Sequence, residues 1–246
     1  MPCRVLLNRR YPCLSLEEAA ALADALGCSI RAEGEEIVFE CGDCGGLARA
    51  AYLRPVEVRR GGRRPLAYRT TATMDPLTAR LMVNLARVKP GDKVLEPFIG
   101  VGAIAVEAEG IGAYVVGVDI DIDLLKAARS NTNADLIHGD ARLLPLRPGF
   151  DAAVGDPPYG RLSIVEGEVK KLLYAVAEAL PGLVKPGGRV VLAGPIYFDL
   201  NLYSCSMYLH GGLYRLIYII RANQEEAPRN TPSPYTSGER SNLGTA

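Results

Sequence analysis

Residues 93–105, KVLEPFIGVGAIA, contain a short apolar strand, a glycine-containing turn and the start of a helix. The same rhythm continues downstream: strand-like runs at 114–119, 136–138, 152–155 and 190–193 alternate with helical stretches near 103–109, 122–131 and 165–184. Such alternation is typical of a parallel sheet with helices on both faces. We therefore predict an α/β fold with a Rossmann-like, doubly wound sheet.

Both ends of this region carry further structural signals. Asp75 and Pro76 have the residue types of a helix cap and a first helical residue. Gly211 and Gly212 separate two strand-like segments, which predicts a tight hairpin and an antiparallel pair at the C-terminal end of the sheet. Residues 222–246 are polar and rich in Pro, Ser, Asn and Thr, so we expect a disordered tail.

Carboxylates follow four of the predicted strands, namely Glu96, Asp119, Asp140 and Asp156. In doubly wound sheets, ligands bind beyond the carboxyl ends of the strands. The spacing of Gly100, Gly102 and Ala105 also fits a dinucleotide-binding turn. An acidic edge would repel a pyrophosphate, however, whereas it suits a cationic sulfonium without phosphate. We therefore predict S-adenosylmethionine as the cofactor.

Each part of this edge has an expected role. The glycine turn would let the backbone approach the cofactor, and Asp119 would bind the ribose hydroxyls. Asp140 would hold the adenine amino group and Glu96 the methionine ammonium. Asp121 and Asp123 are interpreted as helix-start carboxylates instead. The candidate cofactor-binding residues are Glu96, Pro97, Gly100, Gly102, Asp119, Ile120, Asp140, Ala141 and Asp156.

The hexapeptide Gly155-Asp156-Pro157-Pro158-Tyr159-Gly160 offers a carboxylate, a carbonyl and an aromatic ring to one planar group. An exocyclic amino nitrogen on a nucleobase attacks an electrophile only if hydrogen bonds draw it toward a tetrahedral geometry. Asp156 and the Pro157 carbonyl would accept those bonds, while Tyr159 would stack on the base. The alternative is a simple turn that ends a strand. The candidate catalytic residues are Asp156, Pro157, Pro158 and Tyr159.

The first 53 residues predict a small, separate α/β unit. Ser15 and Glu18 have the spacing of a capping box at the start of a helix. Five of the six cysteines lie in the first 44 residues, and Cys41 and Cys44 have the spacing of a metal-binding pair. A zinc site, disulfides and buried free thiols all remain open.

Residues 54–72 form an arginine-rich linker between this unit and the sheet. Its arginines are Arg54, Arg59, Arg60, Arg63, Arg64 and Arg69. They are either contacts for RNA phosphates or part of a solvated linker. The predicted organisation is therefore a unit at 1–53, a linker at 54–72, a catalytic domain at 73–221 and a tail at 222–246.

The order of these motifs resembles the class I S-adenosylmethionine-dependent amino methyltransferases, and most closely the archaeal tRNA guanine-10 N2-methyltransferases. The resemblance covers residues 73 to about 221 and implies a methyltransferase sheet and a tRNA substrate. Glu96 and Ile99 depart from the Asp and Cys that are usual there. The 70 or so residues upstream can hold only the N-terminal ferredoxin-like portion of a THUMP domain. The small surface left for RNA capture suggests a partner protein or a homo-oligomer, and the resemblance to tRNA methyltransferases suggests a small zinc-binding activator subunit as that partner.

Other functions remain open at this point. The same chemistry would serve on DNA, another RNA or a protein glutamine, and a noncatalytic RNA-binding subunit would keep the fold without turnover. The N-terminus lacks the apolar stretch of a secretory signal, and no apolar run approaches the length of about 20 residues that spans a bilayer. We therefore expect a cytosolic protein.

Overall fold

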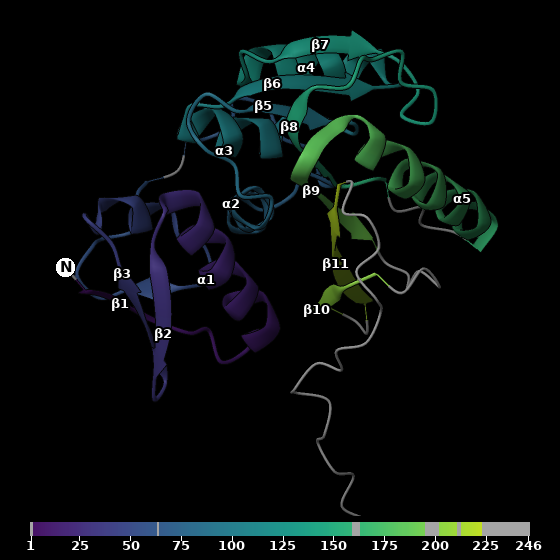
Figure 1. The fold of residues 1–246 in the computed structure, drawn as a ribbon. Coiled ribbons are helices and arrows are strands. Elements are labelled where there is room, and N and C mark those ends of the chain that lie inside the picture. The colour runs from purple at the N-terminus through teal and green to yellow at the C-terminus, as the bar shows by residue number, and fades with distance from the viewer. Residues whose placement is uncertain (1, 63, 159–162, 195–201, 211–212, 223–246) are drawn as a thin grey trace, which may run out of the picture.

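The structure, a computed structural model, describes residues 2–62, 64–158, 163–194, 202–210 and 213–222 (Figure 1). The larger of two units is built around a seven-stranded sheet in the order β10-β11-β9-β8-β5-β6-β7. Its strands are β5 (Lys93–Glu96), β6 (Tyr114–Asp119), β7 (Asp135–His138), β8 (Phe150–Gly155), β9 (Val184–Gly194), β10 (Ser204–His210) and β11 (Leu213–Arg221). Strand β11 pairs antiparallel with both of its neighbours, β10 and β9, whereas the other described strand pairs of this sheet are parallel.

This sheet confirms the predicted fold class, including the antiparallel pair of β10 and β11. From β5 the strand order proceeds through β6 and β7 on one side and through β8 and β9 on the other. A ligand crevice is expected where the order reverses, between the carboxyl ends of β5 and β8. Gly211, Gly212 and the tail at 223–246 lie outside the described residues.

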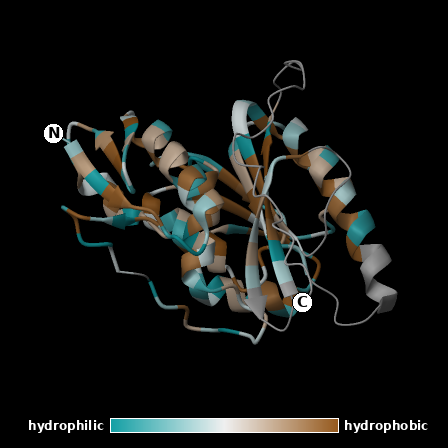
Figure 2. Cartoon of the chain, turned by 90° about the horizontal axis from the view of Figure 1, so that it is seen from below, coloured by the Kyte–Doolittle hydropathy of each residue, from teal (hydrophilic) through white to brown (hydrophobic). Residues whose placement is uncertain are grey.

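Helices cover both faces of the sheet. One face packs against α2 (Pro76–Leu85), α3 (Ala103–Ile111) and α4 (Ile122–Asn131), and the other packs against α5 (Ser163–Ala179). Neighbouring residues of β5 point to opposite faces: Val94 joins the core under α2 and α3, whereas Leu95 joins the core under α5. The hydrophobic residues are concentrated in these central strands (Figure 2). None of the described helices is long and apolar enough to cross a membrane.

The N-terminal residues form a second, four-stranded antiparallel sheet in the order β2-β3-β1-β4. Its elements are β1 (Pro2–Leu6), α1 (Pro12–Leu26), β2 (Ser29–Glu33), β3 (Glu36–Glu40), the 3-10 helix η1 (Gly45–Arg49) and β4 (Arg54–Pro55). This order is that of a ferredoxin-like sheet in which η1 replaces the second helix. Strand β4 lies just past residue 53, in the segment expected to be a linker.

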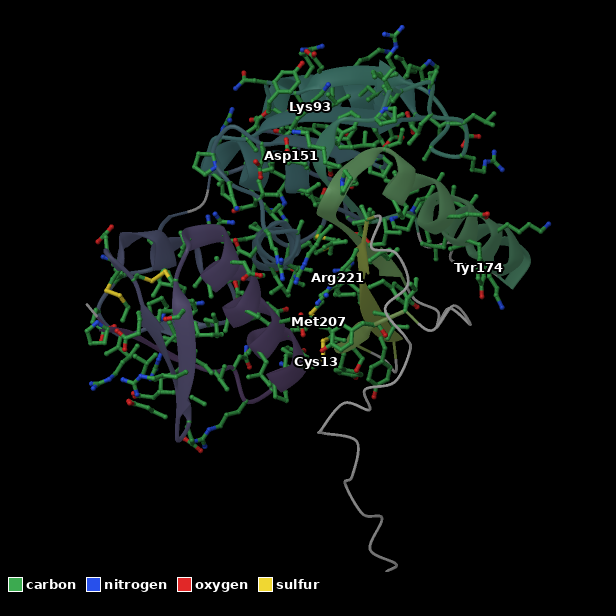
Figure 3. The ribbon with its side chains drawn as sticks, in the orientation of Figure 1. Cys13, Lys93, Asp151, Tyr174, Met207 and Arg221 are labelled. Atoms are coloured by element: carbon green, nitrogen blue, oxygen red, sulfur yellow. A yellow bond between two sulfur atoms is a disulfide. The ribbon has the colours of Figure 1, made fainter. Side chains whose placement is uncertain are left out.

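All six cysteines are paired in disulfides. Cys3 is bonded to Cys44 and Cys28 to Cys41, so both bridges lie within the N-terminal unit. Cys13 of α1 is bonded to Cys205 of β10 and joins this unit to the edge of the large sheet (Figure 3). Of the alternatives left open by the sequence, the structure therefore shows disulfides. The described residues hold no cluster of His, Cys, Asp or Glu that could bind a metal ion.

The predicted capping box at Ser15 and Glu18 is wrong. Helix α1 begins at Pro12, and Tyr11, its N-cap residue, makes no side-chain capping hydrogen bond. Proline is favoured at a first helical position because its missing N–H would have no helical partner there. Ser15 and Glu18 consequently lie inside the helix and are fully buried.

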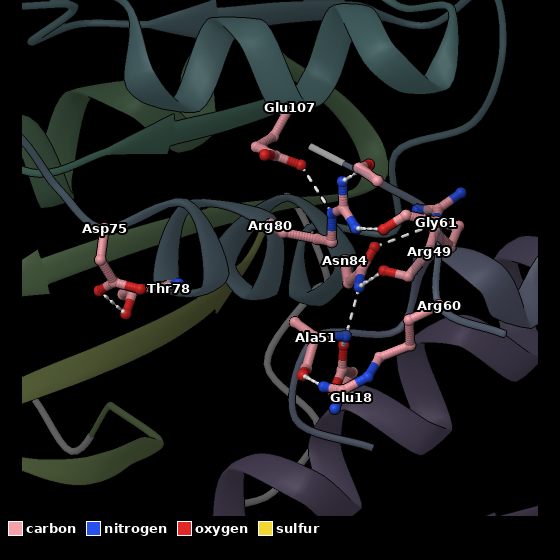
Figure 4. A network of polar contacts seen from close by, with 11 residues as sticks. Glu18, Arg49, Ala51, Arg60, Gly61, Asp75, Thr78, Arg80, Asn84 and Glu107 are labelled. Carbon is pink, nitrogen blue, oxygen red and sulfur yellow. Dashed lines mark hydrogen bonds and ion pairs between the residues drawn. The ribbon is translucent and has the colours of Figure 1, made fainter. Parts of the chain in front are cut away.

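Glu18 instead holds the junction between the two units (Figure 4). Its carboxylate accepts hydrogen bonds from the backbone N–H groups that follow η1, at 2.6 Å from Ala51, 2.7 Å from Tyr52 and 3.0 Å from Leu53. It also accepts one from the Asn84 amide of α2 at 2.8 Å. Arg80, on the same helix, pairs with Glu107 and donates to the carbonyls of residues 61 and 62. The segment around residues 61 and 62 is thus fastened to α2, which packs on one face of the large sheet.

Candidate functional site at the carboxyl edge of the sheet

A cavity of about 760 Å³ opens beyond the carboxyl ends of β5, β6 and β8, at the expected reversal of strand order. It brings together most of the residues singled out in the sequence. The members that line it are Glu96, Pro97, Gly100, Asp119, Ile120, Asp140, Ala141, Asp156, Pro157 and Pro158. Gly102 is not among the lining residues, and Tyr159 lies outside the described residues.

Glu96 is the most deeply buried carboxylate of this cavity, with 1% of its surface exposed. Burial raises its pKa well above the ordinary value, and the negative charges of Asp119, Asp156 and Glu109 raise it further. The Ala105 backbone N–H opposes this shift. The second carboxylate oxygen, Oε2, has no hydrogen-bond partner among the described residues. A buried oxygen of this kind is a favourable position for a cationic ligand group.

The glycine turn between β5 and α3 is held by Asp119. The Gly100 N–H donates to Oδ2 of Asp119 at 2.8 Å, and the Asp121 N–H donates to Oδ1 at 2.9 Å. Gly100 and Gly102 adopt positive φ angles of 52° and 86°. A Cβ atom on Gly102 would lie 2.4 Å from a methyl carbon of Thr132, so this glycine permits close packing of the turn.

Two other aspartates on this edge have distinct local roles. Asp121 caps α4, because its carboxylate accepts from the N–H groups of Asp123 and Leu124, which confirms its interpretation as a helix-start residue. Asp140 is paired with Arg142, whose Nε lies 3.0 Å from both carboxylate oxygens and whose Nη2 lies 2.5 Å from Oδ2. These hydrogen bonds lower the pKa of Asp140, which is therefore ionised and fixed in orientation.

Asp156 follows β8 directly and is paired with a residue that the sequence did not single out. Nη2 of Arg215, on β11, lies 3.5 Å from Oδ2 of Asp156. Both side chains are largely buried, with 11% and 14% of their surfaces exposed, and both line the cavity. Because their positions are 59 residues apart in the sequence, only the placement of β11 beside β9 brings them together.

The wall facing the strand ends was also missed. It is formed mainly by the segment before α2 and by side chains of α4 and α5; the additional lining residues include Thr70, Thr71, Ala72, Thr73, Met74, Asp75, Phe98, Leu124, Val169 and Leu172. The only local signal was the capping pair after Met74, and it is confirmed: Asp75 accepts from the Thr78 N–H and Pro76 is the first residue of α2. That signal predicts the residue at which α2 begins. It does not predict that the segment before α2 turns toward the strand ends.

Comparisons with known proteins agree with this geometry. Residues 62–206 match a family described as an RMKL-like methyltransferase domain. A tRNA (guanine(10)-N2)-dimethyltransferase of Methanothermobacter thermautotrophicus is 37% identical over 174 residues, which cover 64% of this chain and 51% of that protein. The enzyme of the same name from Methanocaldococcus jannaschii is 37% identical over 165 residues, or 60% and 46% of the two chains. The chain thus spans about half the length of the curated relatives it matches.

A solved structure shares the fold over a larger part of the chain. TrmN from Thermus thermophilus aligns with 89% of this chain and 81% of its own, with a TM-score of 0.54 and 21% sequence identity. This likeness concerns the fold alone. The sequence match, by contrast, extends over more than half of the chain and includes the glycine turn and every acidic strand end. The chain therefore belongs to the family of RMKL-like methyltransferase domains.

Proposed function

We propose that this protein transfers a methyl group from S-adenosylmethionine to the exocyclic N2 amino group of a guanine in tRNA, at position 10. The observation that carries the proposal is the convergence of four carboxylates and the Asp156-Pro157-Pro158 segment on one cavity. The substrate is supported by the names of the relatives, which act on guanine 10 of tRNA.

The residues of the cavity fit S-adenosylmethionine. Glu96 has a buried oxygen without a partner among the described residues, and the nearby Asp119 and Asp156 make its surroundings negative. Such a site complements an ammonium and a sulfonium, whereas the pyrophosphate of a dinucleotide would be repelled. We assign Glu96 to the ammonium, Asp119 to the ribose hydroxyls and Asp140 to the adenine amino group. Pro97, Gly100, Ile120 and Ala141 complete the lining of the proposed cofactor site, and Gly102 is proposed to contribute through the close packing of the turn.

The chemistry needs a methyl donor and an oriented amino group. When bound, S-adenosylmethionine supplies an electrophilic methyl group on its sulfonium. The Asp156 carboxylate and the Pro157 carbonyl would accept hydrogen bonds from the guanine amino group and direct its lone pair at that methyl. As the nitrogen takes the methyl group it loses a proton, which passes to Asp156 or to a water molecule. Pro158 would fix the turn, and Tyr159 is proposed to stack on the flipped base.

RNA capture is assigned to the N-terminal unit and to part of the arginine-rich segment. Arg60 donates to the Ala51 carbonyl at 2.7 Å and Arg64 pairs with Glu109, so these two arginines contribute to the structure. Arg54, Arg59 and Arg69 are exposed and are the better candidates for phosphate contacts. We keep the proposed division at 1–53, 54–72, 73–221 and 222–246, with β4 continuing the first sheet into the second segment.

Two further proposals concern the setting of this activity. A small zinc-binding activator subunit or a second copy of the chain would add RNA-binding surface. The proposed location is the cytosol, where disulfides persist in the proteins of hyperthermophiles.

The test is incubation of the protein with methyl-labelled cofactor and unmodified tRNA, followed by nucleoside analysis. We expect label in N2-methylated guanosine at position 10. Asp156→Ala should lower transfer by about 10²–10⁴-fold and change cofactor affinity only a few-fold. Asp123→Ala, on the exposed surface of α4, is the matched control and should keep full activity.

Each alternative function predicts a different result. Label in adenosine, or in a DNA or protein substrate, would favour an amino methyltransferase of another specificity. Calorimetric binding of S-adenosylmethionine without any transfer would favour a noncatalytic RNA-binding subunit. Full transfer by Asp156→Ala would contradict the proposed chemistry.

A further inference from the structure

Arg215 brings a positive charge to the carboxylate proposed to orient the substrate. It lies near the start of β11, beside the final residues of β9, because Leu216 pairs with Gly194. This register places its side chain at the carboxyl edge of the sheet. Its Nη2 atom lies 3.5 Å from Oδ2 of Asp156, and only 11% of the Arg215 side chain is exposed.

The other charges around Asp156 are mostly negative. Glu96 ends β5, Asp119 ends β6 and Asp75 begins α2, and all three line the same cavity. Asp156 is close enough to Glu96 for its charge to raise the Glu96 pKa. Asp140 and Arg142 also line the cavity, but they form an ion pair with each other. Among the described lining residues, Arg215 is therefore the cation placed at Asp156.

We infer that Arg215 is a positioning residue, which holds Asp156 as an oriented carboxylate and so directs the substrate amino group toward the methyl donor. This inference rests on the proposed function. An ionised carboxylate accepts hydrogen bonds only, whereas a protonated one also donates and would lose acceptor capacity toward an amino group. A largely buried carboxylate close to another one, as Asp156 is to Glu96, is protonated more readily, and a cation at about 3.5 Å opposes that change.

The guanidinium also restrains the direction of the carboxylate. A carboxylate side chain that follows a strand can rotate about two bonds, and a pairing with Oδ2 disfavours most of those rotamers. Small errors in the placement of a reacting group lower rates by about 10²-fold. Arg215 thus combines a charge effect, which lysine can reproduce in part, with an orientation effect, which lysine cannot reproduce because it lacks the planar fork.

The test compares Arg215→Met, Arg215→Lys and a control, Arg221→Met, at the opposite end of the same strand. We expect Arg215→Met to lower kcat by about 10²-fold while cofactor affinity changes less than about 3-fold. The acid limb of its kcat profile should move upward by about one pH unit or more. Arg215→Lys should recover part of kcat and most of the pH profile, and Arg221→Met should match the wild type.

A second measurement needs neither tRNA nor turnover. Titration of the Asp156 carboxyl carbon by NMR should give a higher pKa in Arg215→Met than in the wild type, with Arg215→Lys in between. An unchanged Asp156 pKa together with an unchanged kcat profile would overturn the inference. If the wild type transfers nothing to tRNA but Asp156 still responds to Arg215, the proposed function fails and the pairing stands. Should Arg215→Met not fold, the comparison of wild type with Arg215→Lys decides the question.

Discussion

Two fully buried glutamates, in two different regions, show how the same side chain can serve structure or ligand binding. Glu18 lies at the junction between the N-terminal unit and α2, and Glu96 lies at the carboxyl edge of the large sheet; 0% and 1% of their surfaces are exposed. Burial raises the pKa of both. Their partners differ: Glu18 accepts four hydrogen bonds, whereas Oε2 of Glu96 has no partner among the described residues.

This difference in hydrogen-bond partners distinguishes a structural carboxylate from one that is suited to bind a ligand. At the junction, protein donors replace the water that Glu18 loses, so the group is satisfied without any ligand. At the sheet edge, other carboxylates surround Glu96 and raise the cost of its negative charge. A bound cation would remove that cost. The region that holds the two units together is therefore complete in itself, and the proposed site is completed by its cofactor.

The largest expected effect is on the junction. Glu18→Ala removes the acceptor of three backbone N–H groups and of the Asn84 amide, which leaves buried donors without partners. We expect the free energy of unfolding to fall by about 3–5 kcal/mol, measured by urea denaturation. Glu35→Ala, in an exposed ion pair near the β2–β3 turn, should change it by less than about 0.5 kcal/mol. A loss of less than about 1 kcal/mol in Glu18→Ala, roughly the worth of one ordinary hydrogen bond, would contradict a structural role.

The junction is also closed by the bridge between Cys13 and Cys205, which are 192 residues apart. Removing it with Cys13→Ser and Cys205→Ser should lower the free energy of unfolding by about 2–4 kcal/mol, because a long loop of the unfolded chain is released. The control pair is Cys28→Ser and Cys41→Ser, whose bridge closes a separation of 13 residues. The control should lose less stability, and an equal or larger loss would argue against the loop-entropy explanation.

The smallest expected change in free energy is in cofactor binding at the sheet edge. Glu96→Gln keeps the shape of the side chain but removes its charge, so cofactor affinity should fall by about 10–100-fold, the worth of one charge-assisted hydrogen bond. Equilibrium dialysis measures this loss. Glu178→Gln, on the exposed surface of α5, is the control and should bind as the wild type does. Undiminished affinity in Glu96→Gln would remove Glu96 from the cofactor site.

The same Glu96→Gln variant also has a predictable pH dependence. The folded-state pKa of Glu96 is raised above its ordinary value of 4.5, so the folded protein binds this proton more tightly than the unfolded chain does. Protonation of Glu96 therefore stabilises the folded protein, and this contribution is full below pH 4.5 and is lost as the pH rises through the folded pKa. The free energy lost is about 1.4 kcal/mol for each pH unit that separates the folded and unfolded pKa values. Without cofactor, Glu96→Gln should therefore become more stable relative to wild type as the pH increases. Parallel stability curves would contradict the raised pKa.

The sequence predicted those features that depend on neighbouring residues. Alternating strand and helix patterns predicted the doubly wound sheet, and Asp75-Pro76 predicted the start of α2, since a cap and a first-turn proline act locally. The capping box at Ser15 failed because a second local signal, Pro12, began α1 one turn earlier. Pro12 and the Ser15/Glu18 spacing each indicated a helix start, and the sequence spacing alone did not show which of the two residues begins α1.

The sequence by itself thus determined the order of the strands along the chain, their acidic ends and the family. Only the tertiary structure decided which of these ends meet in one cavity, that Glu18 binds the loop after η1, and that Arg215 meets Asp156. The physical reason is that burial and charge pairing depend on distances across the sheet. Those distances are set by strand order and register, and the position of a residue in the sequence does not contain them.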